Sequence, residues 1–431
     1  MRGEKTFFMK QLLTLAFIAI CPFYLASQNI DTIFSETVAS VQLRVNGDFK
    51  NGNLPVTPLK GGSLTLTFDD LNAIFSNFSY TIEQCDRDWQ PTRLEKIEYL
   101  EGLMEDRITD MKNAQATNVA YVSYQVTIPN QTVRWNKSGN YLLKVFEDNA
   151  EKTPILTRRF IVFEEILLPN PEFQIPIGFK FNSSHELDFK LEAKNFRISN
   201  PINELRATVI QNGRWDRAKQ NIKPSFVVGD QINFDYQDSL VWPAGKEWRY
   251  VDMRSTRFRS ERVQTIVNGE DTWEFLMRPD LDRSREPYLI YPDLNGGYFV
   301  ETQDFRNQGG GNSRIQADYG NLFMALKYKE PIPDADVYVF GQLSDWKIDD
   351  RFKLEYDEKR LEYAGEIQLK QGFYNYCYVV VPRKTGIPDF SMLEGDWYET
   401  ENEYHIIIYY RAFGARFDRV IGYQKTLSSR R

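Results

Sequence analysis

Short runs of alternating apolar and polar residues recur along this sequence and constrain its fold more than any other feature. Leu64–Phe68 (LTLTF) is one such run, and Leu354–Tyr356 belongs to another. A period of two residues is typical of a strand that buries one face. Turn signals such as Asn212–Gly213 separate the runs. The pattern predicts an all-β chain, and the aromatic content of 14% agrees because aromatic side chains favour strands.

The length of the chain and two proline-rich breaks predict several domains. A chain of 431 residues is too long for one hydrophobic core. Pro169–Pro171 and Pro331–Pro333 are stiff segments that mark boundaries. We therefore predict three consecutive immunoglobulin-like or early-set β-sandwich domains after a cleaved signal peptide. The expected bounds are 1–27 for the signal peptide, then 28–168, 169–330 and 331–431 for the N-terminal, central and C-terminal domains.

The N-terminus has the features of a secretory signal peptide. An apolar core, Gln11–Ile20, precedes small residues that predict cleavage after Ser27. No later stretch has 18 uninterrupted apolar residues, so we expect an exported chain that does not span a membrane. Cys85 and Cys377 would remain, and we expect both to be buried free thiols. Export without a disulfide framework suits a bacterial periplasm.

The segment from Asp336 to Phe417 is expected to form the C-terminal sandwich. Its last strand, His405–Tyr410, is expected to close the sandwich. Its motifs Val337–Gly341, Asp345–Trp346 and Gly372–Tyr376 resemble early-set modules found beside glycogen-branching and isoamylase domains. The resemblance implies α-glucan binding through exposed tryptophans, and Trp346 matches one such position. A glycan-binding envelope module is therefore the alternative function. No second tryptophan matches, and packing of Trp346 over the sandwich core is the favoured interpretation.

Residue patterns that carry catalysis or metal binding are missing from the sequence. His185 and His405 lack partners at metal-ligand spacing, and neither a nucleophile elbow nor a phosphate-binding glycine loop occurs. We expect no catalytic residue, no cofactor and no metal. Acidic pairs leave a glycan hydrolase as the least favoured function. These pairs are Asp69–Asp70, Asp86 with Asp88, and Asp349–Asp350. The net charge of -7 argues against a nucleic-acid partner.

Arginines and aromatic residues are concentrated in the stretch Trp248–Arg262. If this stretch is a strand, Arg257 and Arg259 share the face opposite Phe258. A solvated face balanced by neighbouring acids is the favoured interpretation. The alternative is a protein-binding face, since arginine and aromatic side chains anchor interfaces. The candidate partner-binding residues are Arg249, Arg254, Arg257, Phe258, Arg259 and, in a long inter-strand region, Trp89.

An ordered set of motifs extends from about residue 35 to 423. The motifs are Ser40–Arg44, Cys85–Pro91 (CDRDWQP), Arg107–Asp110, Ser138–Phe146, Gln211–Asp216, Val337–Gly341 and Glu394–Tyr404. In this order they resemble the Plug protein family of the type IX secretion system in Bacteroidota. The resemblance implies a non-enzymatic periplasmic protein at the inner face of the outer membrane. Its implied partner is the large translocon barrel protein, bound by one copy of this chain within a hetero-complex.

Overall fold

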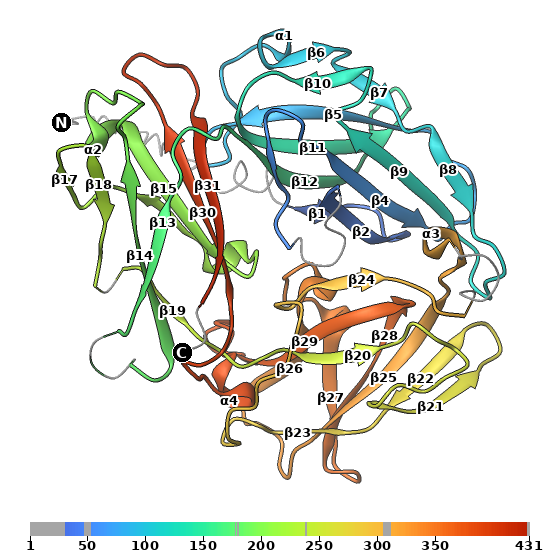
Figure 1. Cartoon of the computed structure of the whole chain (residues 1–431). Helices are drawn as coiled ribbons and strands as arrows, with labels where there is room; N and C mark the ends of the chain where they lie inside the picture. The colour runs from blue at the N-terminus through green and yellow to red at the C-terminus, as the bar shows by residue number, and fades with distance from the viewer. Residues whose placement is uncertain are drawn as a thin grey trace, which may run out of the picture.

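Strands form almost all of the regular structure in the computed structural model of this chain (Figure 1). The structure describes residues 31–46, 53–176, 178, 181–237, 239–304 and 312–428. The expected signal peptide, residues 1–27, lies outside these ranges. The prediction of an all-β chain is confirmed. Within the described ranges no helix is long and apolar enough to cross a membrane.

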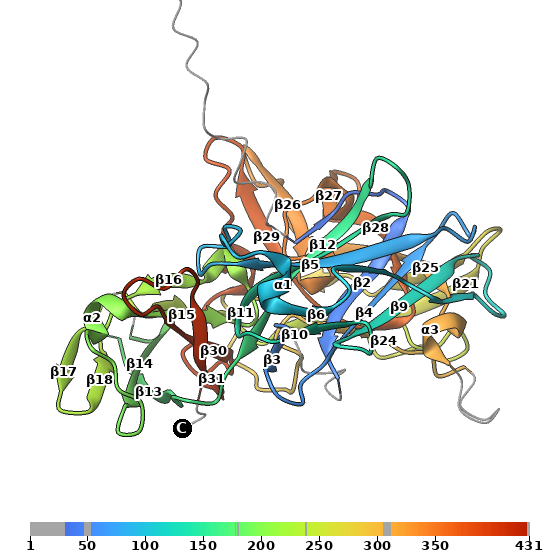
Figure 2. The ribbon, with the colours of Figure 1, turned by 90° about the horizontal axis from the view of Figure 1, so that it is seen from above.

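The strands gather into three units, each with a hydrophobic core of its own. In Figure 1 the blue and teal strands form the first unit, the green and dark red strands the second, and the yellow and orange strands the third. Seen from above in Figure 2, the second unit lies to one side of the other two. Contacts join every pair of units, and two of these interfaces are described below.

The first unit is a sandwich of two sheets. One sheet has the order β1 (Thr32–Ile33), β12 (Pro154–Phe163), β11 (Gly139–Glu147), β5 (Phe78–Cys85) and β7 (Glu105–Arg107), with β3 (Val56–Pro58) on β12. The other has the order β2 (Val38–Val45), β4 (Leu64–Asp70), β9 (Val122–Ile128) and β8 (Asp110–Asn113). The short elements β6 (Leu100–Gly102), β10 (Val133–Trp135) and α1 (Lys96–Tyr99) close one end. Alternation in β4 buries Leu64, Leu66 and Phe68 in the shared core, as predicted.

The second unit is also a sandwich, and it combines strands from distant parts of the chain. Its first sheet has the order β13 (Asn170–Gln174), β14 (Ser184–Glu192), β18 (Gln231–Phe234) and β17 (Phe226–Val228), with β19 (Val241–Pro243) on β14. Its second sheet has the order β16 (Lys219–Ile222), β15 (Leu205–Gln211), β30 (Glu403–Tyr410) and β31 (Arg419–Leu427). The short helices α2 (Pro201–Glu204) and η3 (Trp215–Arg217) flank β15.

The third unit is a large sheet that curls around one core. The order is β20 (Arg249–Asp252), β29 (Gly372–Pro382), β26 (Ala335–Phe340), β27 (Lys353–Asp357), β28 (Glu362–Lys370), β25 (Tyr319–Lys327), β22 (Trp273–Met277) and β21 (Val263–Asn268). In addition β23 (Asp280–Leu281) pairs with β25, and β24 (Tyr298–Val300) pairs with β29. Short helices α3 (Ser313–Gln316), η5 (Gln342–Ser344), η6 (Asp350–Phe352) and α4 (Ser391–Glu394) connect these strands. Side chains from β20, β22, β25, β26 and β29 meet in this core, so the sheet encloses it.

Sheet pairing differs from the sequence prediction in two places. The expectation that His405–Tyr410 closes the C-terminal sandwich is wrong, because β30 pairs with β15 of the second unit, with Ile407 opposite Thr208. The strands on either side of Pro331–Pro333 also belong to one sheet, since β25 pairs with β28 along its whole length. Alternation shows which face of a strand is buried but does not identify its neighbour, so the sequence could not reveal either pairing.

The first and second units meet along an apolar surface that we call the aromatic seam. Leu142 and Ile161 project from the outer face of the first sandwich onto Ile407 and Ile210 of the second. This contact explains why β11 and β12 are buried on both faces. At the edge of the seam, Trp215 packs edge-on against Trp89 of the first unit, with ring centroids 5.1 Å apart.

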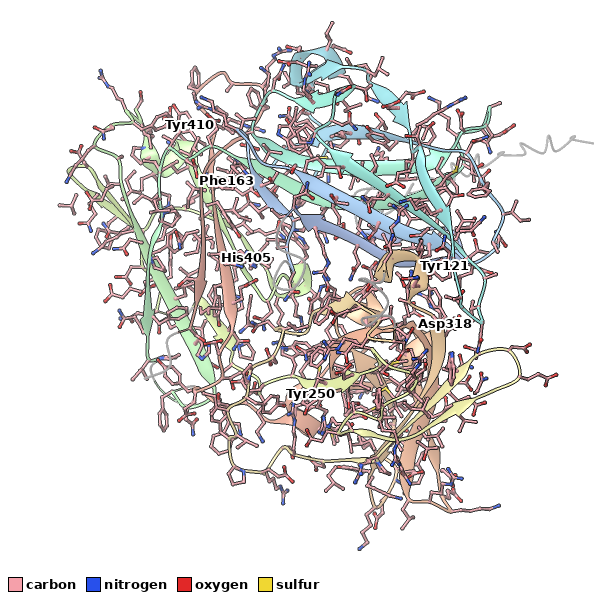
Figure 3. All side chains as sticks on the ribbon, turned by 45° about the vertical axis from the view of Figure 1, so that its right-hand side comes forward. Tyr121, Phe163, Tyr250, Asp318, His405 and Tyr410 are labelled. Carbon is pink, nitrogen blue, oxygen red and sulfur yellow. The ribbon has the colours of Figure 1, made fainter. Side chains whose placement is uncertain are left out.

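The first and third units meet at a polar surface that we call the charged seam. Lys370 of β28 donates to the Asp69 carboxylate of β4 at 2.5 Å, and both side chains are almost fully buried. The Tyr319 hydroxyl donates to the same carboxylate at 2.8 Å. Asp318 accepts backbone hydrogen bonds from the first unit, and Tyr121 donates its hydroxyl hydrogen to a carbonyl of the third (Figure 3). Burial lowers the pKa of Lys370, and the Asp69 carboxylate opposes this effect.

Candidate partner-binding surface

The arginine-rich stretch forms a loop, residues 253–262, which we call the arginine loop. The condition under which Arg257 and Arg259 would share a strand face is not met, because β20 ends at Asp252 and β21 begins at Val263. One further backbone hydrogen bond, from Met253 to Gly372, continues the pairing with β29 before the chain turns away. The loop therefore leaves the sheet edge with its backbone free to turn, and the strand-face argument for Arg257 and Arg259 does not apply.

A single carboxylate fixes the base of the arginine loop. Asp304 accepts hydrogen bonds from the Ser255 hydroxyl at 2.6 Å and from the Thr256 amide and hydroxyl, both at 2.9 Å. Gln371 of the neighbouring strand connection donates to it at 3.0 Å. Burial disfavours the charged carboxylate, but the hydrogen bonds from Ser255, Thr256 and Gln371 outweigh this and lower the pKa of Asp304. The base of the loop is thus held by an ionised group at neutral pH.

Ser255 also organises the tip of the loop. Its hydroxyl oxygen accepts hydrogen bonds from the backbone amides of Arg257 and Phe258, each at 3.1 Å. The side chain of Phe258 is 77% exposed, and Arg257 and Arg259 beside it are exposed as well. Arg259 donates to the Gln264 carbonyl at 2.9 Å, which leaves most of its five N–H groups available. The tip therefore presents a phenyl ring between two guanidinium groups.

Arg254 supports the loop from inside. Its guanidinium contacts both Asp252, at 2.7 Å, and Glu301, at 2.8 Å. Hydrogen bonds from its nitrogens to Asp252 and Glu301 raise the pKa of Arg254 against the opposing effect of burial. Phe299 and Phe373 lie against the same group. Because its donors are occupied, Arg254 positions the loop, and it is less available to a partner than the residues at the tip.

Arg249 lies in the interior of the third unit and does not reach the surface. It is 3% exposed and pairs with Glu394 at 3.0 Å and with Asp280 at 3.2 Å. Burial lowers the pKa of Arg249, but the Glu394 and Asp280 carboxylates raise it by more. The same arginine-rich stretch thus has one end in the core and the other in solvent. Residue composition alone does not predict which arginine is buried.

Trp89 is a contact residue within the chain. Its side chain is 6% exposed in the aromatic seam, where it packs against Trp215, and the Arg159 guanidinium lies 5.4 Å from its ring centroid. Asp31 holds that guanidinium through two hydrogen bonds of 3.0 and 3.1 Å. The contact that we expected Trp89 to make with a partner is made instead with the second unit.

Trp346, the candidate for glycan binding, is half-buried at the junction of the units. Its ring packs against Trp248 at 5.7 Å and Phe340 at 5.8 Å, and the Arg214 guanidinium lies 5.9 Å from its centroid. A sugar platform requires a free aromatic face. These contacts use the ring for packing, so the geometry gives no support to the glycan alternative.

The acidic pairs and histidines have structural partners. Asp69 binds Lys370, Asp86 accepts backbone amide hydrogens at 2.9 Å, and Asp349 binds Arg351 at 2.6 Å. His185 and His405 are both buried, and the Nε2 atom of His405 lies 2.8 Å from Glu403. The part of the chain that the structure describes holds no cluster of metal-ligating side chains. Both Cys85 and Cys377 are buried and unpaired with each other, as the sequence predicts.

Sequence reasoning missed the residues that shape the arginine loop. Asp304 and Gln371 anchor it from distant positions, and nothing in their local sequence marks them. Ser255 could have been recognised, because a serine hydroxyl in a turn often accepts a hydrogen bond from the backbone amide two residues later. The arginine density did identify the loop itself.

A match to a known family covers the first unit. Residues 38–164 match the family model described as the type 9 secretion system plug protein first domain. This confirms the resemblance that the motifs predict, on a stretch that contains four of them: Ser40–Arg44, Cys85–Pro91, Arg107–Asp110 and Ser138–Phe146.

A solved structure resembles the chain over nearly its whole length. A hypothetical protein from Parabacteroides merdae ATCC 43184 is 28% identical, with a TM-score of 0.85 over 92% of this chain and 99% of that one. The α-2-macroglobulin of Escherichia coli aligns at 9% identity over 90% of this chain and 34% of its own, with a TM-score of 0.17, which is too low to support an argument. Among curated proteins none matches this sequence.

Proposed function

We propose that this chain, whose first unit belongs to the type 9 secretion system plug family, binds and seals the inner end of the large outer-membrane translocon barrel of that system. The family match over residues 38–164 carries the proposal. The chain would act in the periplasm, at the inner face of the outer membrane, after removal of residues 1–27. It would act without catalysis, since sealing a pore needs shape and reversible contacts.

The seams between the units support a sealing role. A plug must keep its outline when solvent or a substrate presses on it. The aromatic seam and the charged seam join the three units through buried contacts such as Leu142 on Ile407 and Lys370 on Asp69. Buried contacts of this kind resist relative motion more than exposed ones do.

The arginine loop supports a reversible contact with the barrel. Its exposed tip offers Phe258 as an apolar anchor and Arg257 with Arg259 as hydrogen-bond donors. Phenylalanine and arginine both anchor interfaces, and a polar interface can be released more readily than a wholly apolar one. Because Asp304 and Ser255 preset the loop, little conformational entropy is lost on binding.

The first test is capture of the barrel by a tagged copy of the mature chain from detergent-solubilised envelopes. Recovery of a very large outer-membrane barrel is the expected result. Arg257→Glu with Arg259→Glu should reduce recovery about tenfold or more, because both charges on the tip are reversed. Lys359→Glu with Arg360→Glu is the matched control, since it makes the same charge change on an exposed turn of the third unit. Failure to recover any barrel would refute the proposal.

Sealing can be measured separately from binding. With the purified barrel in vesicles that contain a fluorescent dye, addition of the wild-type chain should slow dye release. The Arg257→Glu, Arg259→Glu variant should slow it only at higher concentration. Binding without any reduction in dye release would mean that the chain docks on the barrel but does not close it.

A further inference from the structure

A fully exposed phenylalanine lies in the loop that joins β30 to β31. We call residues 411–418 the hairpin loop, and Phe413 at its tip has an exposed fraction of 102%. Small residues surround it: Ala412, Gly414 and Ala415. Turns of this kind ordinarily carry glycine or short polar residues, so turn formation does not explain a phenylalanine here.

A buried carboxylate fixes the base of the hairpin loop. Asp418 accepts the Arg87 backbone amide hydrogen at 3.0 Å and pairs with Arg411 at 2.8 Å. Beyond the tip, Arg416 pairs with Glu98 of α1, whose neighbour Ile97 is 76% exposed. The loop is thus held at both ends, and one end of the molecule presents two exposed apolar side chains.

The hairpin loop and the arginine loop share one construction. In each, an aspartate anchors the base, an exposed phenylalanine forms the tip, and guanidinium groups flank it. We infer that the hairpin loop is a second docking point for the same barrel protein, with Phe413 entering an apolar socket that has carboxylate or carbonyl acceptors on its rim. This inference rests on the proposed function.

The two docking points lie on different units of one connected body. Figure 3 labels Tyr410, the residue just before the hairpin loop, at the upper left, and Tyr250, in the strand that leads into the arginine loop, in the lower half. The seams fix the separation between the loops. When one loop is bound, the other is held at a high effective concentration near its own socket, provided that the sockets have the matching spacing.

The charges at the hairpin loop favour a protein partner over a lipid surface. Attraction to anionic lipids depends on unneutralised lysine and arginine near the membrane. Here Arg411 shares the Asp418 carboxylate with Arg87, Arg416 pairs with Glu98, and the chain as a whole has a net charge of -7. Directional acceptors in a protein socket can still use the free N–H groups of these arginines.

Substitution of the two loop-tip phenylalanines, Phe258 and Phe413, tests the inference. The variants are Phe258→Ser, Phe413→Ser, the double substitution, and Ile387→Ser as a control that removes an apolar side chain 70% exposed elsewhere. Affinity for the purified barrel in detergent is the readout. Each phenylalanine variant should bind about tenfold more weakly, the double variant about a hundredfold, and the control as well as wild type. Equal thermal midpoints would show that all four variants are folded.

The outcomes separate the two proposals. If the wild-type chain does not bind the barrel, the proposed function fails. If wild type binds and Phe258→Ser weakens binding while Phe413→Ser does not, only the second docking point is overturned. Vesicles of phosphatidylethanolamine and phosphatidylglycerol provide the remaining arm. If the wild-type chain binds these vesicles and Phe413→Ser does not, with the affinity for the barrel the same in both, the inference is also overturned. That result would assign the loop to the membrane.

Discussion

The aromatic seam and the charged seam join the first unit to its neighbours by opposite chemistries. The aromatic seam is a continuation of a hydrophobic core, in which Leu142, Ile161 and Ile407 exclude water. The charged seam centres on the buried ion pair of Lys370 with Asp69 and on the hydroxyl group that also binds this carboxylate. Arg314 adds a more exposed pair with Asp110. Apolar contacts tolerate small shifts, whereas a buried ion pair is stable only in one geometry. The difference predicts that the charged seam specifies orientation and the aromatic seam supplies affinity.

The largest effect is expected from breaking the ion pair. Lys370→Met leaves the Asp69 carboxylate buried with the Tyr319 hydroxyl as its remaining side-chain partner, which should lower the free energy of unfolding by about 3 to 5 kcal/mol. Urea unfolding followed by fluorescence measures this change. Lys327→Met is the control, since its pair with Glu362 is partly exposed and should contribute less than about 1 kcal/mol.

A double substitution sharpens this result. Lys370→Met with Asp69→Leu removes both charges, so most of the lost stability should return. If the double variant is as unstable as Lys370→Met, the loss comes from packing, and the comparison between the seams is wrong.

A smaller effect is expected at the aromatic seam. Trp215→Ala removes a half-buried ring that contacts Trp89 and that lies 4.5 Å from the Arg159 guanidinium. The expected loss in the free energy of unfolding is about 2 to 3 kcal/mol. Trp215→Phe should recover more than half of it, because an aromatic ring is retained. Equal losses in the two variants would indicate that the indole makes a specific contact beyond packing.

Asp31 tests the support beneath that seam, and its effect depends on pH. Burial raises the pKa of Asp31, but the Arg159 and Arg158 guanidinium groups lower it by more, to below the ordinary value of 3.8. A lowered pKa stabilises the folded state at pH values above the ordinary pKa. This stabilisation is lost as the pH falls through the folded-state pKa. Asp31→Asn should therefore cost about 1 to 2 kcal/mol near pH 7 and progressively less in acid. A pH-independent difference from wild type would contradict this account.

The smallest effect is a change in the rate at which a reagent modifies the two cysteine thiols. Burial raises the pKa of the Cys85 and Cys377 thiols to about 12. Both should react slowly with a thiol reagent at pH 8 and rapidly in denaturant, because the thiolate is the reactive form. Cys85 belongs to the aromatic seam, so Trp215→Ala should accelerate its reaction. If Trp215→Ala accelerates the reaction of Cys377 alone, the substitution exposes a part of the molecule other than the aromatic seam.

The sequence predicted local structure well. The alternating run Leu64–Phe68 lies in β4, where Leu64, Leu66 and Phe68 are buried as the alternation predicts. Asn212–Gly213 likewise forms a turn directly after β15. These features depend on residues that are close in the sequence, so a short stretch of sequence is enough to predict them.

Long-range features could not be read in the same way. The pairing of β15 with β30 depends on the whole topology, and Lys370 at the end of an alternating run looks like a solvated residue although the first unit covers it. The candidate site shows the same limit. Arg249 and Arg257 have similar sequence surroundings, yet one is buried in an ion-pair network and the other is exposed on a loop.

The pairing of β30 with β15 also determines when the molecule can finish folding. The third unit is an insertion between the two halves of the second sandwich, so that sandwich lacks β30 and β31 until the final residues of the chain are present. During synthesis the first unit can fold early, but the second has to wait for β30 and β31. A copy truncated before β30 would leave an open edge on β15, a form prone to aggregation and proteolysis. Closure of the second sandwich therefore requires β30 and β31, since β15 has no partner on that side without them.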